Sequence, residues 1–285
     1  MTKKGNRKVL THIFLILVSL ISIFPLYYMI ISSTNTSPDV LKARMVPGSA
    51  LPENFRKLIN ETNFLSALKN SILVAFFGTI LSVLINGLAG YGFEIYHSKA
   101  KDTTMSILLL SMMVPGAATM IPMYVLFAKL GLLNSVPGYI LPFLSSAFLI
   151  MLFRQNTRSF PYEIVESARV DGLSELGIFF RMYFPTMKGV FATGAIVSFM
   201  NLWNEYLWGL VVMQSQESLT LPLVLANLNQ GYSIDYGLIM LLATLTTLPL
   251  AVMFFALQKY FTAGLTGSVK GCFIQCLIKK EKRRK

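Results

Sequence analysis

The 285-residue sequence lacks several features that enzymes and ATPases need. It contains no Gly-Lys dipeptide, so it has no P-loop of the form G-x-x-x-x-G-K-[ST] to hold nucleotide phosphates. Its two histidines, His12 and His97, lie far apart and supply no evident metal site or catalytic triad. Cys272 and Cys276 have no histidine close by and are most simply reduced thiols on one face of a short helix. We therefore expect no catalytic residue, metal site or cofactor in this chain.

Charged residues are also scarce, because they make up 13% of the chain whereas 54% of its residues are hydrophobic. Soluble domains carry about 25% charged residues. A helix needs roughly 20 apolar residues to cross the ~30 Å hydrocarbon core of a bilayer. The chain has six long and nearly charge-free runs, which are 9–32, 70–93, 104–129, 136–153, 189–213 and 236–260. The sequence therefore predicts an all-α membrane protein with six transmembrane helices.

The first run follows a basic segment, an arrangement that a secretory signal peptide shares. Signal peptides have apolar regions of about 7 to 15 residues and end in a small-residue cleavage site. This run is longer, and it is followed by Ser-Ser-Thr-Asn at 32–35 without an A-x-A pattern. We interpret it as an uncleaved first helix.

The distribution of lysine and arginine predicts the orientation in the membrane. If the N-terminus is cytoplasmic, 19 of the 25 basic residues fall on the cytoplasmic side, and the loop 214–235 on the other side has none. Positive residues favour the cytoplasm. Both termini and the polar segment between the fourth and fifth runs are therefore predicted to be cytoplasmic. The basic residues are scattered over separate loops, so we expect contact with anionic lipid of the bilayer and not with nucleic acid.

The polar segment between the fourth and fifth runs has signals for a helix, a turn and a second helix. Pro161 can open a helix, Glu163 and Glu166 complement its N-terminal dipole, and Gly172 supplies a break. Pro185 is expected to turn the chain back into the bilayer. Such a short amphipathic helix can dock in a groove on a partner and transmit its movement. The simpler alternative is a surface helix that only links two spans.

Several motifs in this half of the chain resemble one protein family. Glu166, Ala168, Gly172 and Pro185 form the pattern E-x-A-x-x-x-G-x(12)-P, which is similar to the cytoplasmic EAA loop of ABC importer permeases. From about residue 90 to 271 the chain looks like the carbohydrate-uptake branch, in particular the six-helix maltose-type subunit. The further similar segments are MLFRQ at 151–155 leading to SFP at 159–161, WNEYLW at 203–208, and LQKYF through GLTGSVKG at 257–271.

The resemblance implies a permease subunit of an ATP-driven importer in a prokaryotic inner membrane, which moves a sugar or oligosaccharide into the cytoplasm. It implies a second permease subunit, a dimeric ABC ATPase that binds ATP and Mg, and an extracytoplasmic solute-binding protein. The implied parts are a cytoplasmic N-terminus at 1–8, a permease membrane domain at 9–271 with its coupling loop at about 160–187, and a basic cytoplasmic tail at 272–285. The residues implied to contact the ATPase are Glu166, Ser167, Ala168, Asp171, Gly172 and Pro185.

The sequence departs from the family pattern at two positions that bear on the cytoplasmic side. Ser167 replaces the second residue of E-A-A, a small-for-small change that should keep helix packing close. Glu94 follows Gly-Tyr-Gly-Phe where the family tends to place small residues and arginine. The tail after Gly271 runs past the usual family end, and its role stays open.

The fifth run carries a second set of candidate residues. Ser198, Asn201, Glu205 and Trp208 are spaced by 3, 4 and 3 residues, so on a continuous helix they share one face. A carboxylate within the membrane is a functional candidate because its exposure to lipid is costly. These four residues are predicted to line the translocation path. Alternatively, the Trp and Asn anchor the helix near an interface and Glu205 pairs with the second permease.

Three other functions stay open from the sequence. The solute of such an importer can be something other than a sugar, such as glycerol phosphate, because a fold does not fix the cargo. An ion-coupled secondary carrier would require an ion site in the membrane, for which Glu205 is the plausible acid, and often has repeated halves, which this chain lacks. A non-transporting scaffold would tolerate charge reversal at Glu166.

Overall fold

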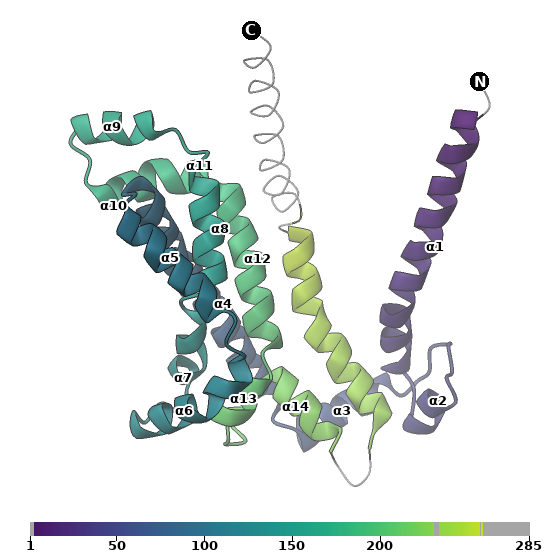
Figure 1. Ribbon diagram of the computed structural model, residues 1–285. Helices are drawn as coiled ribbons and strands as arrows, with labels where there is room; N and C mark the ends of the chain where they lie inside the picture. Colours follow the sequence, from purple (N-terminus) through teal and green to yellow (C-terminus); the bar gives the residue numbers. More distant parts are fainter. Residues whose placement is uncertain (1–2, 231–233, 257, 259–285) are drawn as a thin grey trace. The chain divides into compact units, whose positions relative to one another are not determined.

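The computed structural model describes residues 3–230, 234–256 and 258 (Figure 1). All regular elements in these residues are helical, which confirms the all-α prediction. The described residues form two compact units, which we treat separately. One comprises the chain as far as Leu68 together with Leu219–Pro249, and the other comprises Lys69–Ser218 together with the residues from Leu250. The C-terminal motif at 257–271, Gln258 excepted, and the tail with Cys272 and Cys276 lie outside the described residues.

The first unit contains one long apolar helix and several short ones. Its elements are α1 (Lys3–Ser32), α2 (Ser37–Leu41), α3 (Leu51–Glu61), α14 (Leu221–Leu228), the start of α4 and most of the helix Tyr236–Ala256. Buried Asn54 joins them because its amide donates to the carbonyl oxygens of Ser33 (2.9 Å) and Asn35 (3.1 Å). Asp235 accepts hydrogen bonds from Ser37 (2.7 Å) and Lys57 (3.2 Å). These polar contacts fix the loop after α1 against the start of the last helix.

A separate short helix, α3, directly precedes the second apolar helix. The structure ends α3 at Glu61 and begins the next helix, α4 (Phe64–Ile95), at Phe64. Thr62 between them has an extended backbone with φ −130° and ψ 157°, which interrupts the helical hydrogen bonds. The second apolar helix is therefore longer at its N-terminal end than the hydrophobic run at 70–93 indicates.

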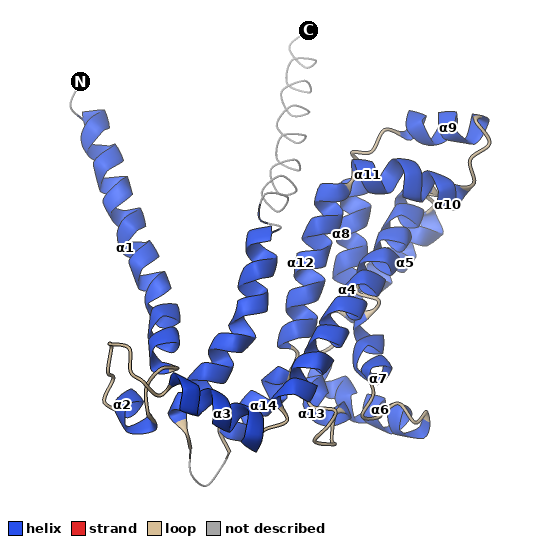
Figure 2. Cartoon of the chain, turned by 180° about the vertical axis from the view of Figure 1, so that it is seen from behind, coloured by secondary structure: helices blue, strands red, loops and turns tan. Residues whose placement is uncertain are grey.

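The second unit is a bundle in which α4, α5, α8 and α12 run side by side (Figure 2). Its first half contains α5 (Lys99–Ser111), α6 (Gly116–Lys129), α7 (Val136–Ile140), the 3-10 helix η1 (Leu141–Phe143) and α8 (Ala147–Thr157). Its second half contains α9 (Tyr162–Val170), α10 (Glu175–Ile178), the π-helix η2 (Phe179–Tyr183), α11 (Phe184–Thr186), α12 (Lys188–Asn204) and α13 (Leu207–Val212).

The six apolar runs do not all form straight helices. The helices Leu10–Ser32, Phe64–Ile95 and Tyr236–Ala256 are each long and apolar enough to cross a membrane. The third run is bent by 98° between α5 and α6, and the fourth by 51° between Val136–Phe143 and α8. The fifth run is interrupted after the 17 residues of α12. Within the residues that the structure describes, length and composition thus give three spans, or up to five if each bent pair is one span, and the count of six stays a prediction.

The bend in the fourth run is stabilised by side chains of α4. Ser82 donates from its hydroxyl to the carbonyl oxygen of Phe143 (3.0 Å), and the Asn86 amide donates to that of Leu144 (2.9 Å). The backbone N–H of Ser146 donates to Oδ1 of Asn86 (2.9 Å). A break within an apolar segment exposes backbone groups that must be satisfied by protein or water. Ser82 and Asn86 satisfy three of them, so this bend is a built feature of the bundle.

Candidate coupling site

The helix α9 is amphipathic, with one face in the core and the other exposed. Pro161 precedes it with φ −64° and ψ 120°, a conformation that a proline favours, and Glu163 lies in its first turn. Val165 and Ala168 are buried at 0% and 3% exposure. The opposite face carries exposed residues at helical spacing, namely Glu163, Glu166, Ser167 and Val170. Four exposed side chains on one face of a surface helix can contact another protein.

The turn after α9 has the geometry of a Schellman cap. The N–H of Leu173 donates to the carbonyl of Ala168, and the N–H of Gly172 to that of Arg169, both at 3.0 Å. Gly172 has φ +79°, a left-handed conformation that other residues rarely adopt, although a Cβ there would meet nothing within 4 Å. The helix, turn and second helix expected from the sequence are thus present.

Arg169 joins the two sides of this turn. Its Nε donates to Oε1 of Glu175 at 2.7 Å, and its Nη1 donates to the hydroxyl of Tyr162 at 3.3 Å. Its guanidinium lies over the ring of Tyr96, 5.6 Å from the centroid. The hydrogen bond from Arg169 lowers the pKa of Glu175, and the same contact raises the pKa of Arg169. Arg169 therefore holds α9 and α10 together next to the end of α4.

The Arg169–Glu175 pair makes the order of this turn pH-dependent. Because the folded-state pKa of Glu175 lies below its ordinary value of 4.5, the stabilisation is complete above that pH and is lost as the pH falls through the lowered pKa. We expect hydrogen exchange in the turn between α9 and α10 to be faster at about pH 3 than at neutral pH, after correction for intrinsic rates. Glu175→Gln should remove this pH-dependent difference, and an equal difference in that variant would contradict the assignment.

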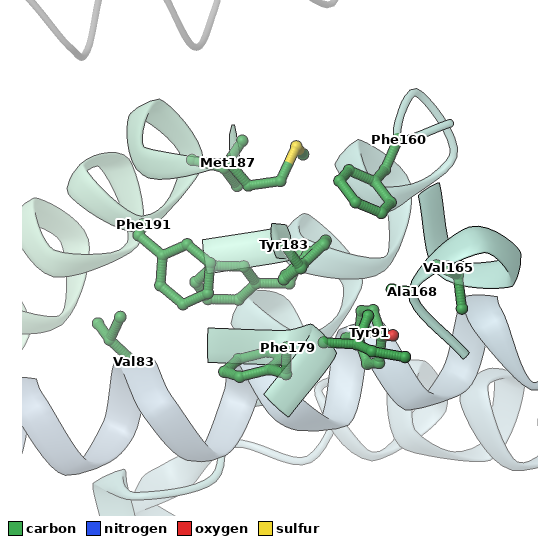
Figure 3. Close-up of a cluster of buried hydrophobic side chains, with 12 residues drawn as sticks. Val83, Tyr91, Phe160, Val165, Ala168, Phe179, Tyr183, Met187 and Phe191 are labelled. Carbon is green, nitrogen blue, oxygen red and sulfur yellow. The ribbon is translucent and has the colours of Figure 1, made fainter. Parts of the chain in front are cut away.

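A cluster of buried hydrophobic side chains connects α9 and α10 to the bundle (Figure 3). Tyr183 is fully buried near its centre and packs against Phe160 and Phe179, with ring centroids 5.3 and 5.4 Å apart. The Tyr183 hydroxyl is 2.6 Å from that of Thr157, and burial raises the pKa of Tyr183 to about 12. We call this set the aromatic core: Val83, Tyr91, Phe153, Phe160, Val165, Ala168, Ile178, Phe179, Tyr183, Met187, Val190 and Phe191.

The aromatic core has members from α4, α8, α9, α10, η2 and α12. Close-packed interiors transmit displacement because they have few voids into which a side chain can yield. The aromatic core thus links α9 to α4, α8 and α12 through packed side chains. The π-helix η2 lies within this core, and such irregular turns are frequent at functional sites.

The structure separates the six predicted coupling residues into two groups. Ala168 lies in the aromatic core, and Glu166, Ser167, Asp171, Gly172 and Pro185 are exposed. The expectation that Pro185 turns the chain back is wrong, because Pro185 lies inside α11. The helical backbone conformation continues through α11 and ends at the next residue, Met187 (φ −95°, ψ 17°). The sequence interpretation also missed Val170, which is 87% exposed, although an apolar residue two positions before Gly172 was a visible sign.

The four residues predicted to share a face of the fifth run do not do so. α12 ends at Asn204, and Glu205 follows with ψ 118°, an extended backbone. Oε1 of Glu205 accepts from the backbone N–H of Trp208 at 2.8 Å and so caps α13. Acidic side chains that bond a backbone N–H three residues on favour a new helix start over a continued helix.

Trp208 and Ser198 lie in different surroundings. Trp208 is 3% exposed, packs edge-on against Phe127 at 5.2 Å, and donates to the carbonyl of Gly138 at 3.2 Å. Ser198 and Asn201 instead line one cavity of about 170 Å³ between α4, the bend before α8, and α12. Of the four residues, Ser198 and Asn201 line the same cavity and Trp208 packs elsewhere, and a role in a translocation path stays a prediction.

A cluster of ion pairs joins α4, α5 and α8. Buried Arg154 donates from Nε to Oε2 of Glu94 at 3.1 Å and also binds Asp102, while Arg158 lies 3.5 Å from Glu94. Glu94, which departs from the family pattern, is thus a partner of Arg154 on α8 and of Arg158 directly after it. Within the described residues, no three His, Cys, Asp or Glu side chains gather to hold a metal ion.

Comparison with known proteins places this geometry in context. Residues 86–267 match the family described as binding-protein-dependent transport system inner membrane component. The lactose transport system permease protein LacG of Rhizobium radiobacter is 41% identical over 254 residues, which cover 89% of this chain and 93% of that protein. The arabinooligosaccharides transport system permease protein AraQ of Bacillus subtilis is 34% identical over 265 residues, covering 91% and 94%.

The fold also matches a solved structure. A chain of a bacterial ABC transporter involved in the import of the acidic polysaccharide alginate superposes with a TM-score of 0.80 at 21% identity, covering 92% of this chain and 98% of that one. At this identity the likeness concerns the fold. It agrees with the all-helical architecture described above.

Proposed function

Because the chain belongs to the family of binding-protein-dependent transport system inner membrane components, we propose that it is a permease subunit of an ATP-driven importer for a sugar or oligosaccharide. The two relatives described above carry lactose and arabinooligosaccharide transport in their names, and they match this chain over nearly its whole length. Both are carbohydrates, which favours a carbohydrate over glycerol phosphate as the solute.

The observation that carries the proposal is the exposed face of α9 above the aromatic core. Glu166, Ser167 and Val170 are free to contact a partner, and Ala168 on the inner face fixes the helix to the bundle. Closure of a dimeric ABC ATPase, driven by ATP with Mg, would push this helix and switch the permease between inward-facing and outward-facing states. For cargo to be released, its affinity must differ between those states.

The rest of the proposed assembly follows from the family and from topology. A second permease subunit completes the translocation path, and an extracytoplasmic solute-binding protein delivers the sugar. Both termini and the coupling loop at about 160–187 are on the cytoplasmic side, as the distribution of basic residues favours. Asp171, Gly172 and Pro185 flank the docking face, with Gly172 setting the turn that presents it.

The ion-coupled carrier has less support than the importer. Its candidate acid, Glu205, is the cap of α13, because its carboxylate accepts the backbone N–H of Trp208. A carboxylate engaged in this way is positioned to hold a helix start.

The proposal is tested by reconstituting the chain with its second permease and ATPase in proteoliposomes. We expect the ATPase to co-purify, the binding protein loaded with sugar to stimulate ATP hydrolysis, and labelled lactose or an arabino-oligosaccharide to enter only with ATP. Uptake that follows an ion gradient without ATP would instead support a secondary carrier. Stimulation by glycerol phosphate and by neither sugar would show that the solute class is wrong.

A further inference from the structure

The cavity beside Ser198 combines three features that a ligand site needs. It has a volume of about 170 Å³, an order of magnitude above the roughly 15 Å³ that a single water requires. It lies at a broken helix, because the bend before α8 forms one of its walls beside α4 and α12. Its lining combines the polar residues Ser82, Ser145, Ser146, Ser198 and Asn201 with the apolar residues Pro142, Phe143, Leu149 and Leu202.

Part of this polar lining is used by the protein itself, and part is not. Ser82 is bonded to the carbonyl of Phe143, and the Ser146 hydroxyl accepts from the backbone N–H of Leu149 at 3.5 Å. In the described part of the chain, the side chains of Ser145, Ser198 and Asn201 have no hydrogen-bond partner. Ser198 is also 96% buried, with 4% exposure. Ser198 Oγ is not among the fully enclosed side-chain atoms, so this hydroxyl opens into the cavity and can bond a molecule that enters it.

The depth of the cavity fits the centre of a bilayer. Ser198 lies ten residues after Lys188, the first residue of α12, which is roughly 15 Å along the helix. If Lys188 marks the membrane boundary, that is about half of the ~30 Å hydrocarbon core. Many secondary transporters bind their substrates at broken helices near the midplane, and this cavity has the same kind of position.

The chemistry of the lining selects the class of ligand. Serine hydroxyls and the asparagine amide each both donate and accept hydrogen bonds, as do the hydroxyl groups of a sugar. None of the residues that line this cavity is charged. A phosphate or carboxylate ligand would lack a counter-charge there, which is costly in a low-dielectric site. A neutral polyhydroxylated solute fits this set of groups, and Phe143 supplies an apolar surface for one face of its ring.

We infer that this cavity is a subsite for sugar hydroxyl groups, in which Ser145, Ser198 and Asn201 bind the neutral solute during translocation. The inference rests on the proposed import function and adds that this subunit contacts the cargo directly. Asn86 is a positioning residue, because it holds the bend that brings Ser145 and Ser146 to the cavity.

The first test measures uptake in the reconstituted full complex, with whichever of lactose and arabino-oligosaccharide the wild type transports. Ser198→Ala and Asn201→Ala should each raise the KM for uptake about threefold to tenfold, the effect of one lost hydrogen bond. Met200→Ala is the matched control, because Met200 is exposed and lies about 200° around the same helix from Ser198. A KM in both cavity variants equal to that of the control would overturn the inference.

A second measurement remains valid if the alanine variants assemble poorly. In a Cys272→Ser, Cys276→Ser background, Ser198→Cys should react with a small membrane-permeant thiol reagent, and the transported sugar should slow that reaction. The reaction of Met200→Cys should not respond to sugar. Equal rates at Ser198→Cys with and without sugar would contradict the subsite.

The two proposals fail in different ways. If the wild-type complex transports neither sugar with ATP, the proposed function fails, whatever the variants show. If the wild type transports sugar, but the KM and the thiol protection are insensitive to Ser198 and Asn201, only the subsite fails.

Discussion

We expect the double variant Glu166→Lys, Val170→Asp to lose its binding to the partner ATPase. Both side chains lie on the exposed face of α9, and neither is part of the aromatic core. Val170 is 87% exposed, and an apolar contact with the ATPase would bury it. A new lysine and a buried aspartate should weaken a docking interface by 2 kcal/mol or more, which is roughly 30-fold in affinity. Retention of the ATPase on the immobilised permease pair measures this directly, and binding-protein-stimulated hydrolysis should fall with it.

The control for this prediction is Glu61→Lys. Glu61 is exposed at the end of α3, which belongs to the other compact unit, so Glu61→Lys makes the same charge reversal at a residue that is not part of the coupling loop. ATPase retention should be unchanged in this variant. If the double variant retained its ATPase as well as the control does, α9 would be a linking helix only, and the scaffold and carrier hypotheses would gain support.

The coupling segment could be predicted from the sequence because its determinants act locally. Pro161 opens α9, and Gly172 ends it through a cap whose hydrogen bonds span five residues or fewer. The link between Arg169 and Glu175 was not predicted, because neither residue type nor spacing shows that a turn brings them together. The aromatic core joins residues from Val83 to Phe191, and pairings at such separation are not encoded in a local pattern.

The apolar runs show the opposite case, because their strong hydropathy signal gave no sign of where the helices bend or end. Hydropathy sums over a window and does not register a bend, so the 98° turn between α5 and α6 was not predicted from a run that includes Pro115. Spacing arguments assume a continuous helix, and that assumption failed at Glu205, whose carboxylate caps the next helix. The polar residues Ser82 and Asn86 within an apolar run were the available signs of a broken neighbour.

The aromatic core depends on close approach between α4 and α8. A Cβ on Gly90 would lie 2.5 Å from Cβ of Phe153 and 2.7 Å from the backbone N of Arg154. Because the backbone N of Arg154 is a main-chain atom, it cannot move away without shifting α8. Gly92, two residues further along α4, has nothing within 4 Å of the position of its Cβ. Gly90 and Gly92 therefore lie on the same helix, but only Gly90 is in close contact with α8.

Gly90→Ala is expected to destabilise the protein by about 1–3 kcal/mol, and Gly90→Val by more, because the added carbons force α4 and α8 apart. Gly92→Ala should be neutral or stabilising by up to about 1 kcal/mol, since alanine restricts the unfolded chain and favours the helix. Thermal unfolding of the purified complex in detergent measures both. Separation of α8 from α4 would also loosen Phe153 and its contact with Phe191, whose ring centroids are 4.8 Å apart, so Gly90→Ala should lower stimulated ATP hydrolysis as well. Equal melting temperatures for the two alanine variants would mean that the helices are not in backbone contact and that the core cannot transmit movement as one body.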